Sequence, residues 1–121
     1  MKETTNTRMD FGVTLANGTA VVKTNIEKLN VLCASELKAE LVKINKESIN
    51  NIIIDMSPTK YCDSSGLSAI LLANRLCKDT NGRFVLCGLQ TNVQKLIEIS
   101  QLDKVLTITA DVEEAQAAIL A

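Results

Sequence analysis

The chain has 121 residues, of which 46% are hydrophobic and 22% charged, and its formal net charge is -1. This length suits one domain, residues 1–121, with a core that needs no disulfide or metal. The balanced charge excludes a basic field for nucleic acid and a polybasic membrane patch. There is no histidine, which excludes histidine metal sites, Ser-His-Asp triads and Cys-His pairs. This removes most hydrolase functions, and we expect no metal, no cofactor and no enzyme activity.

Residues 1–8 lack the apolar core of a signal peptide, and no apolar run approaches membrane-spanning length. The four cysteines, Cys33, Cys62, Cys77 and Cys87, have apolar neighbours and no Cys-x-x-Cys spacing. This pattern is typical of reduced, buried thiols. We expect a cytoplasmic protein without membrane insertion.

The first half of the chain predicts a hairpin followed by a helix. Two β-prone runs, 9–15 and 19–23, are joined by Ala16-Asn17-Gly18, and Asn-Gly is a strong hairpin signal. Beyond an apolar loop, 25–33, Leu37, Leu41 and Ile44 recur at helical spacing, with charges on the opposite side. This spacing predicts an amphipathic helix over 35–44.

The second half predicts alternating strands and helices. A continuous apolar run, 50–56, indicates a central strand that Pro58 ends. A helix over about 65–78, a turn at 79–82 and a buried strand at 83–88 complete a parallel β-α-β unit. Capping boxes at Thr91 and Asp111 predict two more helices, with a strand at 105–108 between them. The fold class is therefore α/β, with a mixed β-sheet, an opening hairpin and about four helices.

The stretch Tyr61-Cys62-Asp63-Ser64-Ser65-Gly66-Leu67 lies where a strand turns into the second helix. Small side chains and unpaired amides at a helix start favour an anion, and Gly66 would leave such donors bare. A purely structural interpretation is that Ser64 or Ser65 is the N-cap and that Gly66 allows a tight turn.

At about 100° per residue, the second helix has a core side and a polar side. The core side is predicted to hold Ala69, Ile70, Leu72, Ala73, Leu76 and Cys77. Leu67 and Leu71 project with the polar residues, one turn apart and directly beyond Ser64. The pattern therefore predicts an exposed docking surface of Ser64, Leu67, Ser68, Leu71 and Arg75.

Together these residues resemble the STAS domain (sulfate transporter and anti-sigma factor antagonist) of anti-sigma factor antagonists. The resemblance rests on the hairpin, Leu29-Asn30 leading into Ser35-Glu36-Leu37, the strand 52–55, the stretch Asp63-Ser64-Ser65-Gly66-Leu67, and Leu86-Cys87-Gly88. Two positions depart from the family: Ser68 stands where a second glycine is common, and Asn30 where an aspartate is common.

The resemblance implies that Ser64 is phosphorylated by an anti-sigma factor that is also a serine kinase, and that a serine phosphatase reverses this. The unphosphorylated form would bind the anti-sigma factor and so free a sigma factor. A phosphate would add about -1.5 to -2 charges beside Asp63 and weaken binding. We expect a monomer or weak dimer. The candidate partner-binding residues are Asn30, Asp63, Ser64, Ser65, Gly66, Leu67, Ser68, Leu71 and Arg75.

Three other functions compete with this hypothesis. The chain would also fit the cytoplasmic STAS subunit of a lipid-transporting ATPase complex, which needs no phosphorylation. An enzyme with Ser64 or Cys62 as nucleophile would lack a histidine base. Nucleotide binding would rest on the helix start alone, without a glycine-rich loop or a P-loop lysine.

Overall fold

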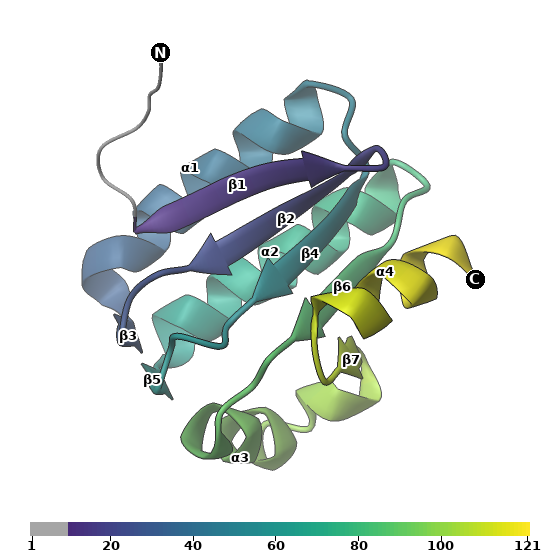
Figure 1. Cartoon of the computed structure of the whole chain (residues 1–121). Coiled ribbons are helices and arrows are strands. Elements are labelled where there is room, and N and C mark those ends of the chain that lie inside the picture. The colour runs from purple at the N-terminus through teal and green to yellow at the C-terminus, as the bar shows by residue number, and fades with distance from the viewer. Residues whose placement is uncertain (1–9) are drawn as a thin grey trace.

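The structure, a computed structural model, describes residues 10–121. Its main sheet has the strand order β1-β2-β4-β6-β7. The strands are β1 (Phe11–Ala16), β2 (Thr19–Thr24), β4 (Asn51–Asp55), β6 (Phe84–Cys87) and β7 (Thr107–Thr109). Only β1 and β2 pair antiparallel among these described strands, and the other neighbours are parallel (Figure 1). The mixed α/β sheet predicted from the sequence is confirmed.

The opening hairpin forms where Asn17 and Gly18 both have positive φ, at 56° and 78°. This backbone twist matches that of two antiparallel strands, so Ala16 pairs with Thr19 directly across the turn. The predicted hairpin is confirmed. Met9, where the predicted first strand begins, lies outside the described residues.

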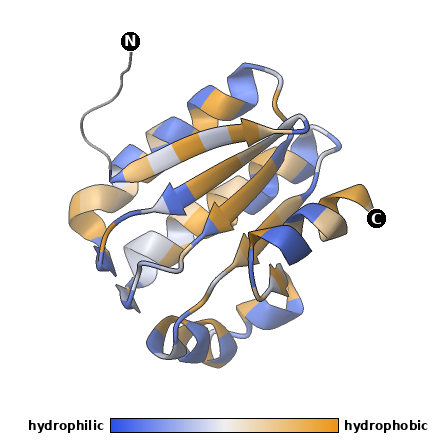
Figure 2. Ribbon diagram, in the orientation of Figure 1, coloured by the Kyte–Doolittle hydropathy of each residue, from blue (hydrophilic) through white to orange (hydrophobic). Residues whose placement is uncertain are grey.

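Helices cover both faces of the sheet, which explains why β6 and the middle of β4 are apolar (Figure 2). Ile52 and Ile54 face α1 (Val31–Lys46), α2 (Ser64–Asp79) and α3 (Thr91–Ile99), and these elements share one core cluster. Ile53 faces the other way, towards α4 (Val112–Leu120). Helices α1, α2 and α3 therefore cover one face of the sheet, and α4 covers the other (Figure 1).

The first helix begins earlier than predicted. Helix α1 starts at Val31 rather than at residue 35, because Asn30 is its N-cap and accepts a 3.0 Å hydrogen bond from the Leu32 amide. The sulfur of Cys33 accepts from the Asn30 amide in return, at 3.4 Å. A thiol in the position usually held by Glu or Gln is a poor sequence signal for a cap.

Two features of the second half also differ from prediction. Thr91 is the first residue of α3 and not its cap, since Gln90 occupies that position without a side-chain bond. The predicted strand at 105–108 forms later, at β7, after a short 3-10 helix, η1 (Leu102–Lys104). Asp111 does cap α4, accepting a 2.9 Å bond from the Glu114 amide.

A separate two-stranded sheet was not predicted. It consists of β3 (Lys28–Leu29) and β5 (Tyr61–Cys62), which pair in parallel. Each strand has only two residues, too few for a periodic pattern to be visible in the sequence. This small sheet lies directly before the starts of α1 and α2 and positions both.

Candidate functional site

Asp63 is the N-cap of α2. Its Oδ1 accepts hydrogen bonds from the amides of Ser65 at 2.9 Å and Gly66 at 3.1 Å. The expectation that Ser64 or Ser65 caps this helix is therefore wrong, as is the expectation that Gly66 leaves its amide donor bare. Ser64 is the exposed first residue of the helix. Its hydroxyl has no hydrogen-bond partner within residues 10–121.

The small sheet brings Asn30 and Asp63 to the same edge of the molecule. Leu29 pairs with Cys62, and the Asp63 amide donates a 3.2 Å hydrogen bond to the Leu29 carbonyl. The next residue after each strand is therefore the N-cap of a helix, Asn30 for α1 and Asp63 for α2. Asn30 thus lies beside the turn that carries Ser64, as a joint binding surface requires.

Gly66 is buried against this small sheet. A Cβ atom at this position would lie 2.5 Å from the Cys62 sulfur and 2.8 Å from the Leu29 carbonyl oxygen. The oxygen belongs to the backbone and cannot rotate away. Glycine is needed here so that α2 can pack closely on β3.

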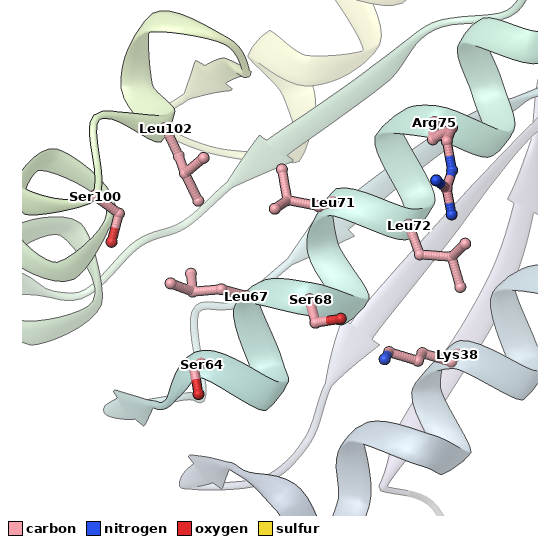
Figure 3. A pocket seen from close by; sticks show the side chains of 9 residues that line it. All are labelled: Lys38, Ser64, Leu67, Ser68, Leu71, Leu72, Arg75, Ser100 and Leu102. Carbon is pink, nitrogen blue, oxygen red and sulfur yellow. The ribbon is translucent and has the colours of Figure 1, made fainter.

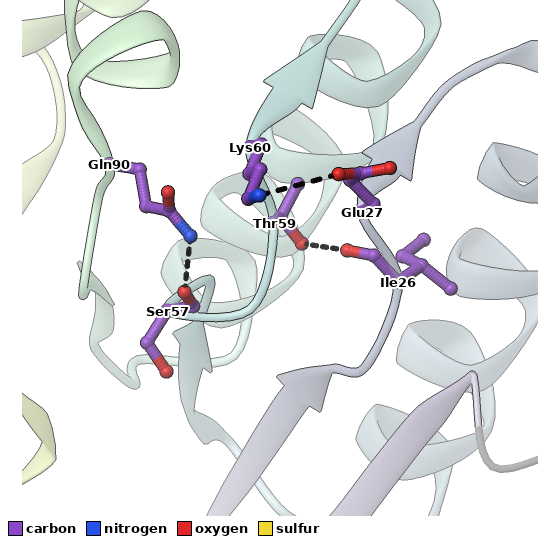
Figure 4. A network of polar contacts seen from close by, with 6 residues as sticks. All are labelled: Ile26, Glu27, Ser57, Thr59, Lys60 and Gln90. Carbon is purple, nitrogen blue, oxygen red and sulfur yellow. Dashed lines mark hydrogen bonds and ion pairs between the residues drawn. The ribbon is translucent and has the colours of Figure 1, made fainter.

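A buried threonine anchors the loop that leads into β5 (Figure 4). The Thr59 hydroxyl lies 2.6 Å from that of Thr24 and donates to the Ile26 carbonyl at 2.8 Å. Earlier in the loop, the Gln90 side-chain amide donates to the Ser57 carbonyl at 2.7 Å. These contacts tie the loop to β2 and to the α3 start, which holds the approach to Ser64 in place.

A groove of about 770 Å³ runs along α2 and begins at Ser64. Helix α1 forms one side, and the end of α3 with η1 forms the other (Figure 3). The lining residues are Lys38, Ser64, Leu67, Ser68, Leu71, Leu72, Arg75, Ser100 and Leu102. All five residues of the predicted docking surface therefore line one groove.

The prediction that Leu67 is exposed is wrong. Its side chain is 9% exposed and belongs to the main core cluster, whereas Leu71 is 37% exposed. Figure 3 shows Leu67 pointing towards the segment from Ser100 to Leu102, which covers that side of α2. Leu72, predicted to be core, is only partly buried and lines the groove. Helical spacing gives the angle of each side chain but does not show which neighbour covers it.

A second hollow of about 350 Å³ lies between the starts of α1 and α2. It is lined by Val31, Ala34, Ser35, Lys38, Ser64, Ser65 and Ser68. Val31 is 66% exposed and the adjacent Leu32 87%. The sequence analysis did not predict this exposed apolar pair, which directly follows Asn30, the N-cap of α1.

The charges around the groove are unequal. Its charged lining residues are Lys38 and Arg75, and no acidic residue lines it.

Burial, followed by the charge of Asp63 and the nearby Cys33, raises the pKa of the Cys62 thiol to about 12. The thiol next to the site therefore stays protonated at neutral pH and is a poor nucleophile.

Residues 10–121 hold no group of three or more histidine, cysteine, aspartate or glutamate side chains that would suit a metal ion. Across the same residues, each helix is too short or too polar to cross a bilayer. The groove and the adjoining hollow meet at Ser64, which lines both.

Comparison with known proteins identifies the family. Residues 10–115 match the STAS domain. BtrV of Bordetella bronchiseptica, named as an anti-sigma factor antagonist, is 29% identical over 90 residues, which are 74% of this chain and 78% of BtrV. A protein of Thermotoga maritima with the same designation has a similar structure, with a TM-score of 0.86 and 20% identity over 93% of this chain and 97% of its own.

The fold is also similar to that of the anti-sigma factor antagonist SpoIIAA. The unphosphorylated form has a TM-score of 0.69 and 17% identity over 89% of this chain and 94% of SpoIIAA. The phosphorylated form, from Bacillus, has values of 0.70 and 18% over 89% and 98%. Since the family match spans most of the chain, the resemblance recognised in the sequence is confirmed: the chain belongs to the STAS domain family.

Proposed function

We propose that this protein is an anti-sigma factor antagonist switched by phosphorylation of Ser64. In its unphosphorylated form it binds an anti-sigma factor that is also a serine kinase, and so frees a sigma factor for transcription. A serine phosphatase restores the binding form. The names of its relatives support the class of partner, and SpoIIAA, which occurs in a phosphorylated form, supports the type of switch.

The observation that carries this proposal is the position of Ser64 at the mouth of the groove. Its side chain is exposed and lines both hollows, and Asp63 has taken over the capping of the helix. The hydroxyl is therefore open to a kinase, and its modification breaks none of the hydrogen bonds that cap the helix. If Ser64 were itself the N-cap, its phosphorylation would disrupt the side-chain hydrogen bond that caps the helix.

The same position explains how phosphorylation would prevent binding. A phosphate brings about -1.5 to -2 charges at neutral pH. It would lie next to the Asp63 carboxylate and at one end of a groove that is lined largely by leucine side chains. A partner surface that fits a neutral hydroxyl would have to bury this charge, which is costly without a dedicated cation. Binding would weaken, while the folded state would persist.

The partner surface we propose comprises the groove, the two helix starts and Asn30. Leu71 provides its exposed apolar centre, and Arg75 lies at the far end (Figure 3). Because Lys38 and Arg75 line the groove without acidic neighbours in the lining, we expect the bound segment of the anti-sigma factor to be apolar with acidic residues beside it.

Calorimetric titration against the purified anti-sigma factor tests the proposal. The wild type should bind, Ser64→Ala should bind comparably, and Ser64→Asp should bind more weakly. Thr14→Asp is the matched control, since Thr14 is exposed and pairs with Val21, whose side chain packs towards α4 on the opposite face of the sheet. Equal affinities for all four proteins would refute the proposed switch.

A further inference from the structure

We infer that Lys38 is the cation that pairs with the phosphate on Ser64. This inference rests on the proposed function for the presence of that phosphate. Lys38 comes from α1, while Ser64 is on α2, yet both side chains line the groove and the adjoining hollow. Figure 3 shows the Lys38 side chain extending from α1 towards the first turns of α2, where Ser64 and Ser68 lie.

Lys38 is available for such a pair. It is partly buried between the two helices, and it has no ion pair or hydrogen bond within residues 10–121. A partly buried ammonium is screened less by solvent than a fully exposed one, so a nearby phosphate gains more from it. The long side chain also has the reach to follow a phosphate on either side of the Ser64 turn.

The helix start by itself is poorly prepared to hold the phosphate. Two of its first amides, those of Ser65 and Gly66, already donate to Asp63. These are among the groups that normally bind an anion at a helix N-terminus. The Asp63 carboxylate also repels a second negative charge. A cation on another element would therefore stabilise the phosphate more than the helix start does.

The other charged residue that lines the groove, Arg75, does not provide such a cation. Arg75 lies eleven residues further along α2, about 16 Å at 1.5 Å per residue. The α3 and η1 side contributes Ser100 and Leu102 to the groove, and neither is charged. The Cys62 thiol has its pKa raised to about 12 and is neutral. Lys38 is thus the cation that shares both hollows with Ser64.

This pairing would make Lys38 part of the switch. In the unphosphorylated protein its charge is free to attract an acidic group of the partner. In the phosphorylated protein the same charge is neutralised, and the ion pair bridges α1 and α2 across the mouth of the groove. Phosphorylation would then remove a favourable cation from the partner surface as well as adding a negative charge.

The inference is tested on full-length protein in which phosphoserine is inserted at position 64 during translation, so that no kinase is needed. A ³¹P NMR titration gives the second pKa of the phosphate, which is about 6 for an unperturbed phosphoserine. We compare the wild type with Lys38→Met, which keeps an unbranched side chain, one atom shorter, and removes its charge. The wild-type pKa should be lower by about 0.5 units or more, because a nearby cation favours the dianion.

Two further variants sharpen the comparison. Lys38→Arg should restore the lower pKa, and Arg75→Met should titrate as the wild type does. The Asp63 carboxylate raises the phosphate pKa equally in all four proteins, so it cancels. Thermal melts of each variant confirm that the fold is kept. Identical titrations of wild type and Lys38→Met, or an equal shift in Arg75→Met, would overturn the inference.

The failure of the Lys38 pairing and the failure of the proposed function would give different results. If the anti-sigma factor does not distinguish Ser64 from phosphoserine while the titration shows the Lys38 shift, the ion pair stands and the proposed switch fails. If the partner does distinguish them and the titration is flat, the switch stands and the role of Lys38 is refuted.

Discussion

The backbone amide of Ser65 donates a 2.9 Å hydrogen bond to Oδ1 of Asp63, and the Gly66 amide donates a second one to the same oxygen. The aspartate of the Asp-Ser-Ser-Gly stretch is thus a structural residue as well as a neighbour of the proposed phosphorylation site. Because Asp63 caps the helix, the Ser64 hydroxyl is left without a hydrogen bond in the described part of the chain. Substitutions of Asp63 should therefore change stability, whereas substitutions of Ser64 should change partner binding.

Asp63→Ala should lower the free energy of unfolding by about 1 kcal/mol, because an N-cap side chain is lost. Asp63→Asn should retain most of the stability, since its side-chain oxygen still accepts from the same amides. Urea denaturation of both variants beside the wild type measures this. If Asp63→Ala proves as stable as the wild type, the cap contributes nothing and the proposed freedom of Ser64 loses its basis.

Incubation with the cognate kinase and ATP should modify Ser64 alone. Ser64 is exposed at the mouth of the groove, whereas Ser65 is partly buried and its amide is held by Asp63. Mass spectrometry of wild type, Ser64→Ala and Ser65→Ala gives the site directly. Phosphate should be absent from Ser64→Ala and present in Ser65→Ala, and undiminished incorporation in Ser64→Ala would contradict the assignment.

Leu71→Asp should weaken partner binding by about 2 kcal/mol or more while changing stability by no more than about 0.5 kcal/mol. The reason is that Leu71 is 37% exposed in the groove. Leu67→Asp is the matched comparison, four residues earlier on the same helix but 9% exposed. It should lower the melting temperature strongly, because an unpaired charge would be buried.

Calorimetric titration and thermal melts of these two leucine variants separate the contributions. Strong destabilisation by Leu71→Asp would show that Leu71 belongs to the core. Unchanged stability together with unchanged affinity would show that the partner binds elsewhere.

Gly66→Ala should destabilise the fold by about 1 to 3 kcal/mol, the usual cost of overpacking. The added methyl group would lie 2.8 Å from the Leu29 carbonyl oxygen, which can retreat only if β3 moves. Alanine is otherwise the better helix former by about 1 kcal/mol, so a stabilising effect would mean that the contact relaxes freely. Ser68→Ala, at an exposed position of the same helix, serves as the control for chemical denaturation.

The cysteines predict how stability depends on alkaline pH. Burial raises the pKa of Cys77 to about 11 and, together with Asp55 and Asp111, that of Cys87 to about 12. Thiolates therefore form more easily in the unfolded chain, whose thiols have the ordinary pKa of 9.0. This contribution to stability is complete below that value and is lost as the pH rises from there towards 12.

Urea unfolding at about pH 7 and about pH 10.5, with reductant present, measures this effect. The two thiols whose pKa is raised to about 12 are Cys62 and Cys87. A double variant, Cys62→Ser with Cys87→Ala, should therefore lose less stability between the two conditions than the wild type does. An equal loss would show that other groups dominate the alkaline response. In addition, denatured protein purified without reductant should present four reactive thiols, as expected of four free cysteines.

The sequence by itself determined the features that depend on neighbouring residues. Asn17 and Gly18 specify the hairpin, because few other pairs accept positive φ at both positions. A continuous apolar run identified the central strand β4, and the residues between it and the next buried strand were identified as the helix α2. The stretch from Asp63 to Leu67, taken together with the hairpin, the strand 52–55 and the segments around Leu29 and Leu86, was enough to recognise the family, since each of these is a pattern of neighbouring residues.

Only the tertiary structure decided which side chains meet. Leu67 is buried because the segment from Ser100 to Leu102 covers it, more than thirty residues away in the chain. Gly66 is required because β3 lies directly beneath it, and β3 is too short to predict. Lys38 lies beside Ser64 because α1 packs against α2. The local pattern of a helix gives the direction of each side chain, whereas burial and pairing depend on what the rest of the chain places there.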